Sequence, residues 1–225
     1  MTAATLPAIT GGRACGRVLQ LALLALCAFG LVLLGRSATI PAKAWAAQIL
    51  LDRAFTRSLA DGRSVKPWPW ADTAPVARIA LPRLGVRQVI LSGGSGQAMA
   101  FGPTALPAPQ AQGRVTILAA HRDTHFAFLA DAKIGDVVTV QPVAGATQRY
   151  RIRSFAVVRH DRFAYPRDPT RPLLLLTTCY PFGATERGPL RLVVAAEQIG
   201  GAAATQPQSI AGRRDIESDS QTIPR

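Results

Sequence analysis

The chain has 225 residues, enough for one domain of ordinary size with appendages, since single cores usually run to about 100 to 200 residues. Its formal net charge of +13 is the kind of excess that nucleic-acid-binding proteins carry. Only 6% of the residues are aromatic, however, whereas proteins that bind single strands need aromatic stacking platforms. We therefore expect no nucleic-acid partner, and anionic lipid headgroups fit the charge better.

The first apolar segment has the composition of a membrane span. Residues 18–35 carry one polar side chain, Gln20, and lie between Arg17 and Arg36. We expect an uncleaved single-pass anchor with residues 1–17 in the cytoplasm, although the segment is slightly shorter than the usual span of about 20 residues. A signal peptide cut after an alanine of the following SATIPAKA is the alternative. Basic residues flank both ends, so export is expected from the large domain that follows, not from charge bias.

A stalk or packing helix is expected next, over residues 36–65. Pro41 suits the first turn of such a helix. Apolar residues then recur at helical spacing along one face: Ala47, Leu50, Leu51, Ala54 and Phe55. Asp61 and Gly62 should end the helix, because the KPWPW segment that follows cannot continue it.

The chain from residue 66 to residue 199 is rich in short strands. Apolar or alternating runs occupy residues 115–120, 137–142, 150–158, 173–179 and 190–196. Residues 76–91 hold two more runs, separated by Pro82 and Gly85. Few helical stretches lie between them, so we expect a mostly β fold, a barrel or a sandwich. Small and polar residues predict a disordered tail over 200–225.

One cysteine stands apart from the other two. Cys15 and Cys27 lie before and within the span, so Cys179 has no disulfide partner in the exported part. An unpaired thiol in an oxidising compartment is a liability unless it is reactive. The alternative is a buried core cysteine, in which case the protein would be a membrane-tethered binding module without enzymatic activity.

Two predicted strands end in reactive residues, and a third carries an arginine. His121 follows the strand at 115–120, Cys179 ends the strand at 173–179, and Arg191 interrupts an apolar strand. A thiolate nucleophile, an imidazole that transfers protons and a guanidinium that stabilises an oxyanion together suit acyl transfer. The sequence has no Gly-rich phosphate loop between a strand and a helix, and we expect no cofactor.

A metal site is the competing interpretation of the histidines. His121 and His125 are four residues apart, with Asp123 between them. Zincin sites need that spacing on a helix with Glu directly after the first histidine, but Arg122 stands there and the segment leaves a strand. Such a site would have to recruit His160. We expect no metal, and we expect Asp123 and His125 to orient His121.

Two segments, TILAAHRDTHF and LLLLTTCYPFGATERGPLRLVVAAE, resemble the signature regions of sortases, and KPWPWADTAPVARIALPRLGV with AFGP at 101–104 resembles the Gram-negative, marine proteobacterial branch of that family. The likeness runs from Lys66 to Glu197. It implies a closed, sortase-type eight-stranded β-barrel with short helices over residues 66–199. It also implies His121, Cys179 and Arg191 as the catalytic residues.

The resemblance further implies a membrane-anchored cysteine transpeptidase. Such an enzyme cleaves an LPXTG-like C-terminal sorting signal through a cysteine thioester and transfers it to an amine, here an acceptor of unknown identity. It would sit in the inner (plasma) membrane with its catalytic domain on the periplasmic side. An exported cysteine peptidase or an L,D-transpeptidase is the alternative with similar chemistry. Arg191 is preferred to Arg187 as the oxyanion donor because a strand holds a side chain more firmly than a loop. Many sortases have glycine where this chain has Ala120.

Overall fold

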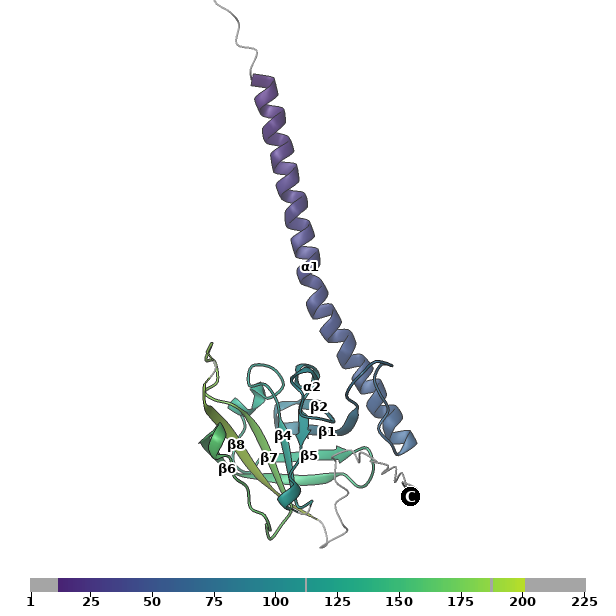
Figure 1. Ribbon diagram of the computed structural model, residues 1–225, viewed down its shortest axis with the longest axis vertical. Helices are drawn as coiled ribbons and strands as arrows, with labels where there is room; N and C mark the ends of the chain where they lie inside the picture. The colour runs from purple at the N-terminus through teal and green to yellow at the C-terminus, as the bar shows by residue number, and fades with distance from the viewer. Residues whose placement is uncertain (1–11, 112, 187, 201–225) are drawn as a thin grey trace, which may run out of the picture. The chain divides into compact units, whose positions relative to one another are not determined.

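The computed structural model describes residues 12–111, 113–186 and 188–200 (Figure 1). It divides into two compact units, residues 1–47 and residues 48–225. Most of the predicted cytoplasmic segment and nearly all of the predicted tail, residues 1–11 and 201–225, lie outside the described residues. Arg187 also lies outside them.

A single helix, α1, runs from Gly12 to Asp61. The expectation that a second helix begins at Pro41 is therefore wrong, because Pro41 lies inside α1. A proline removes one helical hydrogen bond, but the alanines and leucines on both sides are strong helix formers and continue the helix through it. In the turn before it, the hydroxyl of Thr39 donates to the carbonyl oxygen of Arg36 at 2.7 Å. The helix ends at Asp61, as predicted, and Gly62 follows with a φ of 65°.

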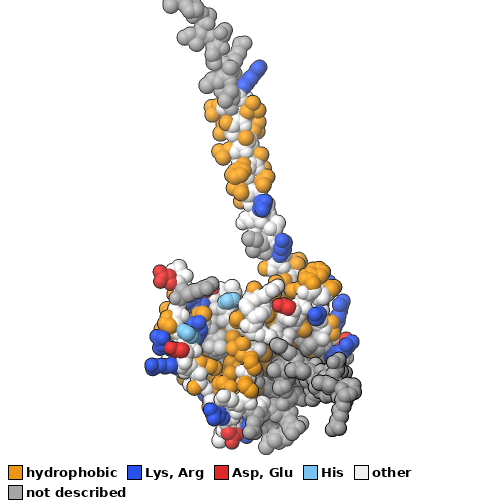
Figure 2. All heavy atoms as spheres, viewed as in Figure 1, with side chains coloured by type: hydrophobic (Ala, Val, Ile, Leu, Met, Phe, Trp, Pro, Cys, Tyr) orange, Lys and Arg blue, Asp and Glu red, His pale blue; other side chains and the backbone are white. Residues whose placement is uncertain are grey.

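The N-terminal part of α1 is apolar on all sides. In the described part of the chain, it is the one helix long and apolar enough to cross a membrane. Its leucine, valine and phenylalanine side chains between residues 19 and 34 are 50% to 69% exposed (Figure 2). A helix that is apolar all round needs an apolar surrounding. The segment therefore suits a lipid environment.

Eight strands in the described part of the second unit close into a barrel in the order β1-β2-β3-β4-β7-β8-β6-β5 (Figure 1). The strands are β1 Pro75–Leu81, β2 Val86–Leu91, β3 Thr104–Leu106, β4 Val115–Ala119, β5 Val137–Pro142, β6 Gln148–Arg159, β7 Leu173–Cys179 and β8 Leu190–Gln198. The helices are short: α2 Gly96–Phe101 and the 3₁₀ turns η1 Pro82–Leu84, η2 Pro109–Ala111, η3 Ala127–Ala130 and η4 His160–Arg162. The predicted eight-stranded barrel is confirmed. Of its strands, only β3 was not predicted individually.

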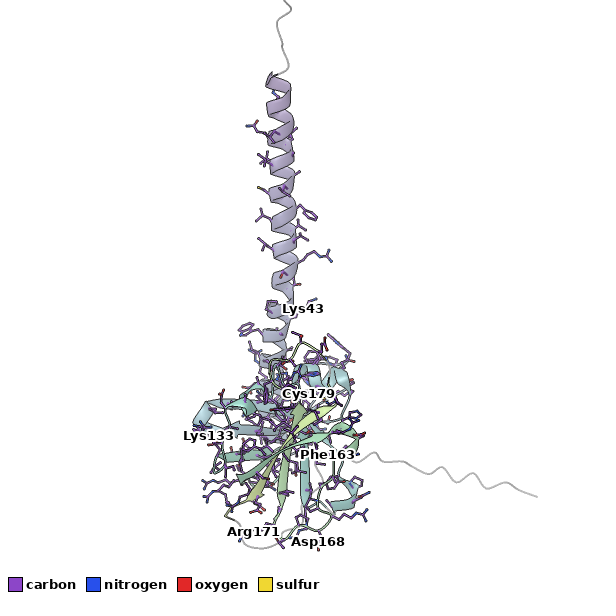
Figure 3. All side chains as sticks on the ribbon, turned by 90° about the vertical axis from the view of Figure 1, so that its left-hand side faces the viewer. Lys43, Lys133, Phe163, Asp168, Arg171 and Cys179 are labelled. Atoms are coloured by element: carbon purple, nitrogen blue, oxygen red, sulfur yellow. The ribbon has the colours of Figure 1, made fainter. Side chains whose placement is uncertain are left out.

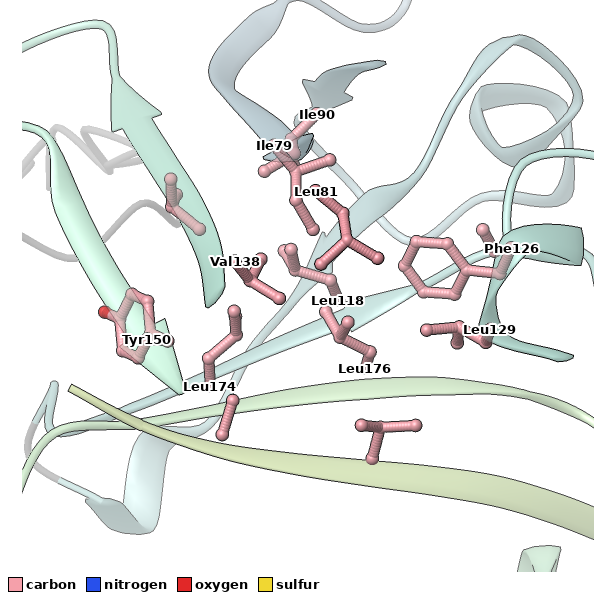
Figure 4. Packing of buried hydrophobic residues seen from close by; sticks show 14 of the residues in the cluster. Ile79, Leu81, Ile90, Leu118, Phe126, Leu129, Val138, Tyr150, Leu174 and Leu176 are labelled. Carbon is pink, nitrogen blue, oxygen red and sulfur yellow. The ribbon is translucent and has the colours of Figure 1, made fainter. Parts of the chain in front are cut away.

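Strand β7 lies between β4 and β8 and is buried on both faces. Its residues Leu174 and Leu176 point into the barrel core, which Figure 4 shows from close by. Leu173 and Leu175 instead join an outer cluster with Ile117. A strand covered on both sides needs a continuous apolar run, which explains the four consecutive leucines.

The C-terminal part of α1 belongs to the second unit and packs on the outside of the barrel. Leu51 and Phe55 are fully buried in a cluster with Val89 and Leu91 of β2 and with Val143, which directly follows β5. Arg78 of β1 donates to Asp52 at 2.6 Å, and its guanidinium carbon lies 4.2 Å from the centroid of the Phe55 ring. Leu50 was predicted on this face but is 38% exposed. Each residue turns a helix by about 100°, so Leu50 points away from the direction in which its neighbour Leu51 is buried.

These neighbouring leucines test whether the helix end is part of the barrel's core. Leu51→Ala should lower the free energy of unfolding of the full chain by about 2 to 5 kcal/mol, because it leaves a cavity in a buried cluster. Leu50→Ala is the matched control and should cost less than about 1 kcal/mol. Urea unfolding in detergent followed by near-ultraviolet circular dichroism measures both. Equal losses would show that the helix end does not stabilise the barrel.

Candidate active site

Two of the three predicted catalytic residues leave the barrel side by side. β4 and β7 are parallel, and the last pair of their ladder is Ala119 with Thr177. His121 and Cys179 each lie two residues beyond this pair. Neighbouring strands are about 4.8 Å apart, so the register brings the imidazole segment next to the thiol. His121 is exposed and Cys179 is half-buried. Figure 3 shows Cys179 at one end of the barrel.

Hydrogen bonds continue between these two chain segments beyond the ladder. The N–H of Ala120 donates to the carbonyl oxygen of Thr177 at 3.3 Å. The buried hydroxyl of Thr178 donates to the carbonyl oxygen of Ala120 at 2.8 Å. These hydrogen bonds hold the two segments together as far as Ala120, the residue before His121. The methyl group of Ala120 packs in the barrel core, so alanine fits where many sortases have glycine.

Arg191 lies directly opposite Cys179 in the antiparallel ladder of β7 and β8. The N–H of Tyr180 donates to the carbonyl oxygen of Leu190 at 3.1 Å, which makes the adjacent Cys179–Arg191 pair a non-hydrogen-bonded one. Side chains of such a pair share one face and approach closely. The three predicted catalytic residues therefore come from three adjacent strand ends.

The guanidinium of Arg191 is held against the backbone. Its Nη1 donates to the carbonyl oxygens of Gly188 and Leu190 at 2.9 and 2.8 Å. Among the residues described, Nε and Nη2 have no protein partner, so this edge of the guanidinium remains able to bind an anion. Arg187, the other arginine considered as oxyanion donor, lies outside the described residues.

His125 lies near His121 but has other partners. Its Nε2 is 3.4 Å from the carbonyl oxygen of Ala100, and its own carbonyl accepts a hydrogen bond from Gln88 at 2.8 Å. Burial lowers the pKa of His125, the hydrogen bond to Ala100 opposes that shift, and the nearby His121 adds to it. A histidine with a lowered pKa is neutral at pH 7. His125 is therefore poorly suited to act as a cation beside the thiol.

Asp123 and His160 complete the set of side chains considered for a metal site. Asp123 pairs with Arg122, whose Nε is 3.1 Å from its Oδ1. His160 lies on η4, after β6. Within the described ranges, no three histidine, cysteine or carboxylate side chains come together in a way that could hold a metal ion.

The sequence reasoning missed one residue of this region, Arg122. Its side chain is 7% exposed. It donates to carbonyl oxygens of the loop that follows Cys179, including that of Pro181 at 2.9 Å. An arginine at the exit of a strand is usually solvated, and no pattern in the sequence separates that case from a buried one.

Comparisons with known proteins bear on the family and the fold. A family model described as the sortase domain matches residues 79–199. No curated protein matches the sequence significantly. Sortase A from Corynebacterium diphtheriae is 23% identical, with a TM-score of 0.51 over 59% of this chain and 64% of that chain. This likeness supports the barrel fold.

Two further solved structures have lower TM-scores. The pilus-related sortase C of Group B Streptococcus is 24% identical, with a TM-score of 0.48 over 56% of this chain and 68% of that chain. Sortase C-1 from Actinomyces oris is 28% identical, with a TM-score of 0.46 over 56% of this chain and 76% of that chain.

The hydrogen bond between Thr178 and Ala120 should stabilise the strand ends that carry the site. Thr178→Val keeps the shape but leaves a buried carbonyl oxygen without its partner, so it should lower the free energy of unfolding by about 1 to 3 kcal/mol. Thr177→Val, one residue away and half-buried, should cost less than about 1 kcal/mol. Chemical unfolding of both variants measures the difference. If Thr177→Val proved the more damaging, the hydroxyl of Thr178 would have no such role.

Proposed function

Since the chain belongs to the sortase family of transpeptidases, we propose that it is a membrane-anchored enzyme that cleaves an LPXTG-like sorting signal between Thr and Gly and transfers the cleaved protein to an amine. The observation that carries this proposal is the register of three strands. It brings the ends of β4, β7 and β8, with His121, Cys179 and Arg191, to one end of the barrel. We assign these three residues the catalytic roles.

The first half of the proposed reaction forms a thioester. The thiolate sulfur of Cys179 attacks the carbonyl carbon of the substrate's Thr, and the carbonyl oxygen becomes an oxyanion. His121, as imidazolium, gives its proton to the nitrogen of the leaving Gly, and the C–N bond breaks. The leaving peptide departs as a neutral amine. The Thr carbonyl remains bound to Cys179, and His121 is left neutral.

The second half reverses these roles. An acceptor amine attacks the thioester carbonyl, and neutral His121 takes a proton from its nitrogen. The C–S bond then breaks, an amide bond forms, and Cys179 returns to the thiolate. One amide bond has been exchanged for another, so the reaction needs no oxidant, reductant or cofactor. The proposed acceptor is a primary amine that reaches the end of the barrel.

Arg191 is the proposed oxyanion donor. The carbonyl oxygens of Gly188 in the loop and Leu190 at the start of β8 hold its Nη1, so the orientation of the guanidinium is set before the substrate arrives. The Nε and Nη2 edge can then donate to the oxyanion of either tetrahedral intermediate. A preorganised donor of this kind contributes about 3 to 4 kcal/mol to transition-state stabilisation.

We assign residues 18–35 to a single-pass span in the inner membrane of a Gram-negative cell, with residues 1–17 in the cytoplasm and residues 66–199 as the periplasmic catalytic domain. The exposed apolar side chains of α1 support the span. Residues 36–65 connect it to the barrel. The compact unit begins at Gln48, so the end of α1 is part of the catalytic domain in structural terms.

Removal of the thiol tests the nucleophile. Cys179→Ala should abolish cleavage of a quenched fluorescent LPXTG-like peptide by the detergent-solubilised full chain, while the free energy of unfolding changes by no more than about 1 to 2 kcal/mol. With the wild-type chain, added triglycine should convert the Thr product from a free acid to an amide, as mass spectrometry would show. Cleavage retained in the variant would exclude Cys179 as the nucleophile. An acid product at every triglycine concentration would favour a cysteine peptidase.

The three histidines allow a matched comparison. His121→Ala should lower kcat/KM for the same peptide by at least about 100-fold, within the range of general acid–base catalysis. His125→Ala and His160→Ala should each lower it by less than about tenfold, since one is bonded to Ala100 and the other lies on η4. Steady-state kinetics of the three variants measure these losses in kcat/KM. A loss at His125 equal to that at His121, restored by added zinc, would instead favour a metal site.

A further inference from the structure

The loop from Tyr180 to Pro189 connects Cys179 with the strand that carries Arg191. It has no helix or strand of its own in its described residues, so its backbone carbonyls need other partners. Two arginines supply several of them. Arg122 and Arg191 donate to the loop carbonyl oxygens of Pro181, Ala184, Glu186 and Gly188.

Arg122 holds the first half of this loop. Its Nη1 donates to Pro181 at 2.9 Å, and its Nη2 donates to Ala184 and, at 3.3 Å, to Glu186. Its Nε donates to Asp123, a carboxylate that is 63% exposed. Burial of a guanidinium is costly unless its donors are satisfied. Here the loop carbonyls satisfy most of them, so the loop and the arginine depend on each other.

The position of Arg122 in the chain gives these bonds a consequence for the site. It directly follows His121, so it joins the imidazole segment to the loop. The same loop carries Gly188, whose carbonyl oxygen accepts from Arg191 at 2.9 Å. A displacement of the loop would therefore move the acceptor that orients Arg191 and release the segment that carries His121.

We propose that Arg122 is a positioning residue: its bonds to the loop after Cys179 keep His121, Cys179 and Arg191 in one arrangement. This inference rests on the proposed function of those three residues. Arg122 itself does not contact the substrate. The planar guanidinium reaches several carbonyls and a carboxylate in fixed directions at once, which the ammonium of a lysine cannot reproduce.

The chain offers a matched control at the other end of the same two strands. Arg114 directly precedes β4 and donates to the carbonyl oxygen of Thr170, before β7, at 2.9 Å. It also pairs with Asp168 at 3.3 Å. Figure 3 shows Asp168 at the opposite end of the barrel from Cys179. Arg114 thus joins the β4 and β7 segments as Arg122 does, but far from the site.

The experiment compares Arg122→Ala, Arg122→Lys and Arg114→Ala in the detergent-solubilised full chain. Kinetic constants are measured with the LPXTG-like peptide at a temperature where each variant is folded by circular dichroism. Loop opening is measured as the rate at which a glutamate-specific protease cuts after Glu186, which is exposed. The protease assay needs no substrate, so it tests the loop contacts even if the proposed function fails.

Arg122→Ala should lower kcat by about 10- to 100-fold, the range expected when reacting groups are misplaced by about 1 Å, with a smaller change in KM. Cutting after Glu186 should become at least about fivefold faster. Arg122→Lys should fall between Arg122→Ala and wild type in kcat, and Arg114→Ala should match wild type in both assays. Unchanged cutting in Arg122→Ala would overturn the proposal, as would a kcat within about twofold of wild type or an equal loss in Arg114→Ala.

Discussion

The parallel pairing of β4 with β7 inside a closed barrel is the constraint on which the site depends. Parallel strands end at the same edge, so residues at equal distances beyond a ladder pair leave the sheet together, as His121 and Cys179 do after Ala119 and Thr177. Antiparallel β8 begins at this same edge, which sets Arg191 opposite Cys179. A slip of one residue would turn every side chain of β7 to the other face. Because its leucines are buried on both faces, such a slip would disturb both the core and the outer cluster.

Backbone register alone does not orient side chains that stand beyond the strands. Polar contacts take over where the ladder ends: the hydroxyl of Thr178 bonds the carbonyl oxygen of Ala120, and two arginines bond the carbonyls of the loop after Cys179. These contacts are buried or half-buried, where a donor or acceptor without a hydrogen bond lowers the stability of the fold. The backbone on both sides of His121 is therefore held in place, although the His121 side chain itself is exposed. The site combines a rigid platform with side chains that a substrate can reach.

Much of this arrangement was predictable from the sequence because its signals are periodic. Runs of apolar residues predicted seven of the eight strands, and reactive residues at the ends of two of them indicated the site. Strand β3 was missed because three residues, Thr104 to Leu106, are too few to show a period. The helix start expected at Pro41 was wrong because the helix-forming residues on both sides continue α1 through the proline. Arg122 was missed because burial of a charge depends on carbonyls about 60 residues away in the chain, which local patterns do not report.

The proposed mechanism requires that Cys179 carries the substrate as a thioester. Intact-protein mass spectrometry of the wild-type chain tests it most directly, after brief reaction with an LPXTG-like peptide without added amine and an acid quench. A thioester on Cys179 should give a mass increase equal to the acyl fragment ending in Thr, mapped to Cys179 and removed by hydroxylamine. The absence of this adduct while the peptide is cleaved, or its location on another residue, would exclude a thioester on Cys179.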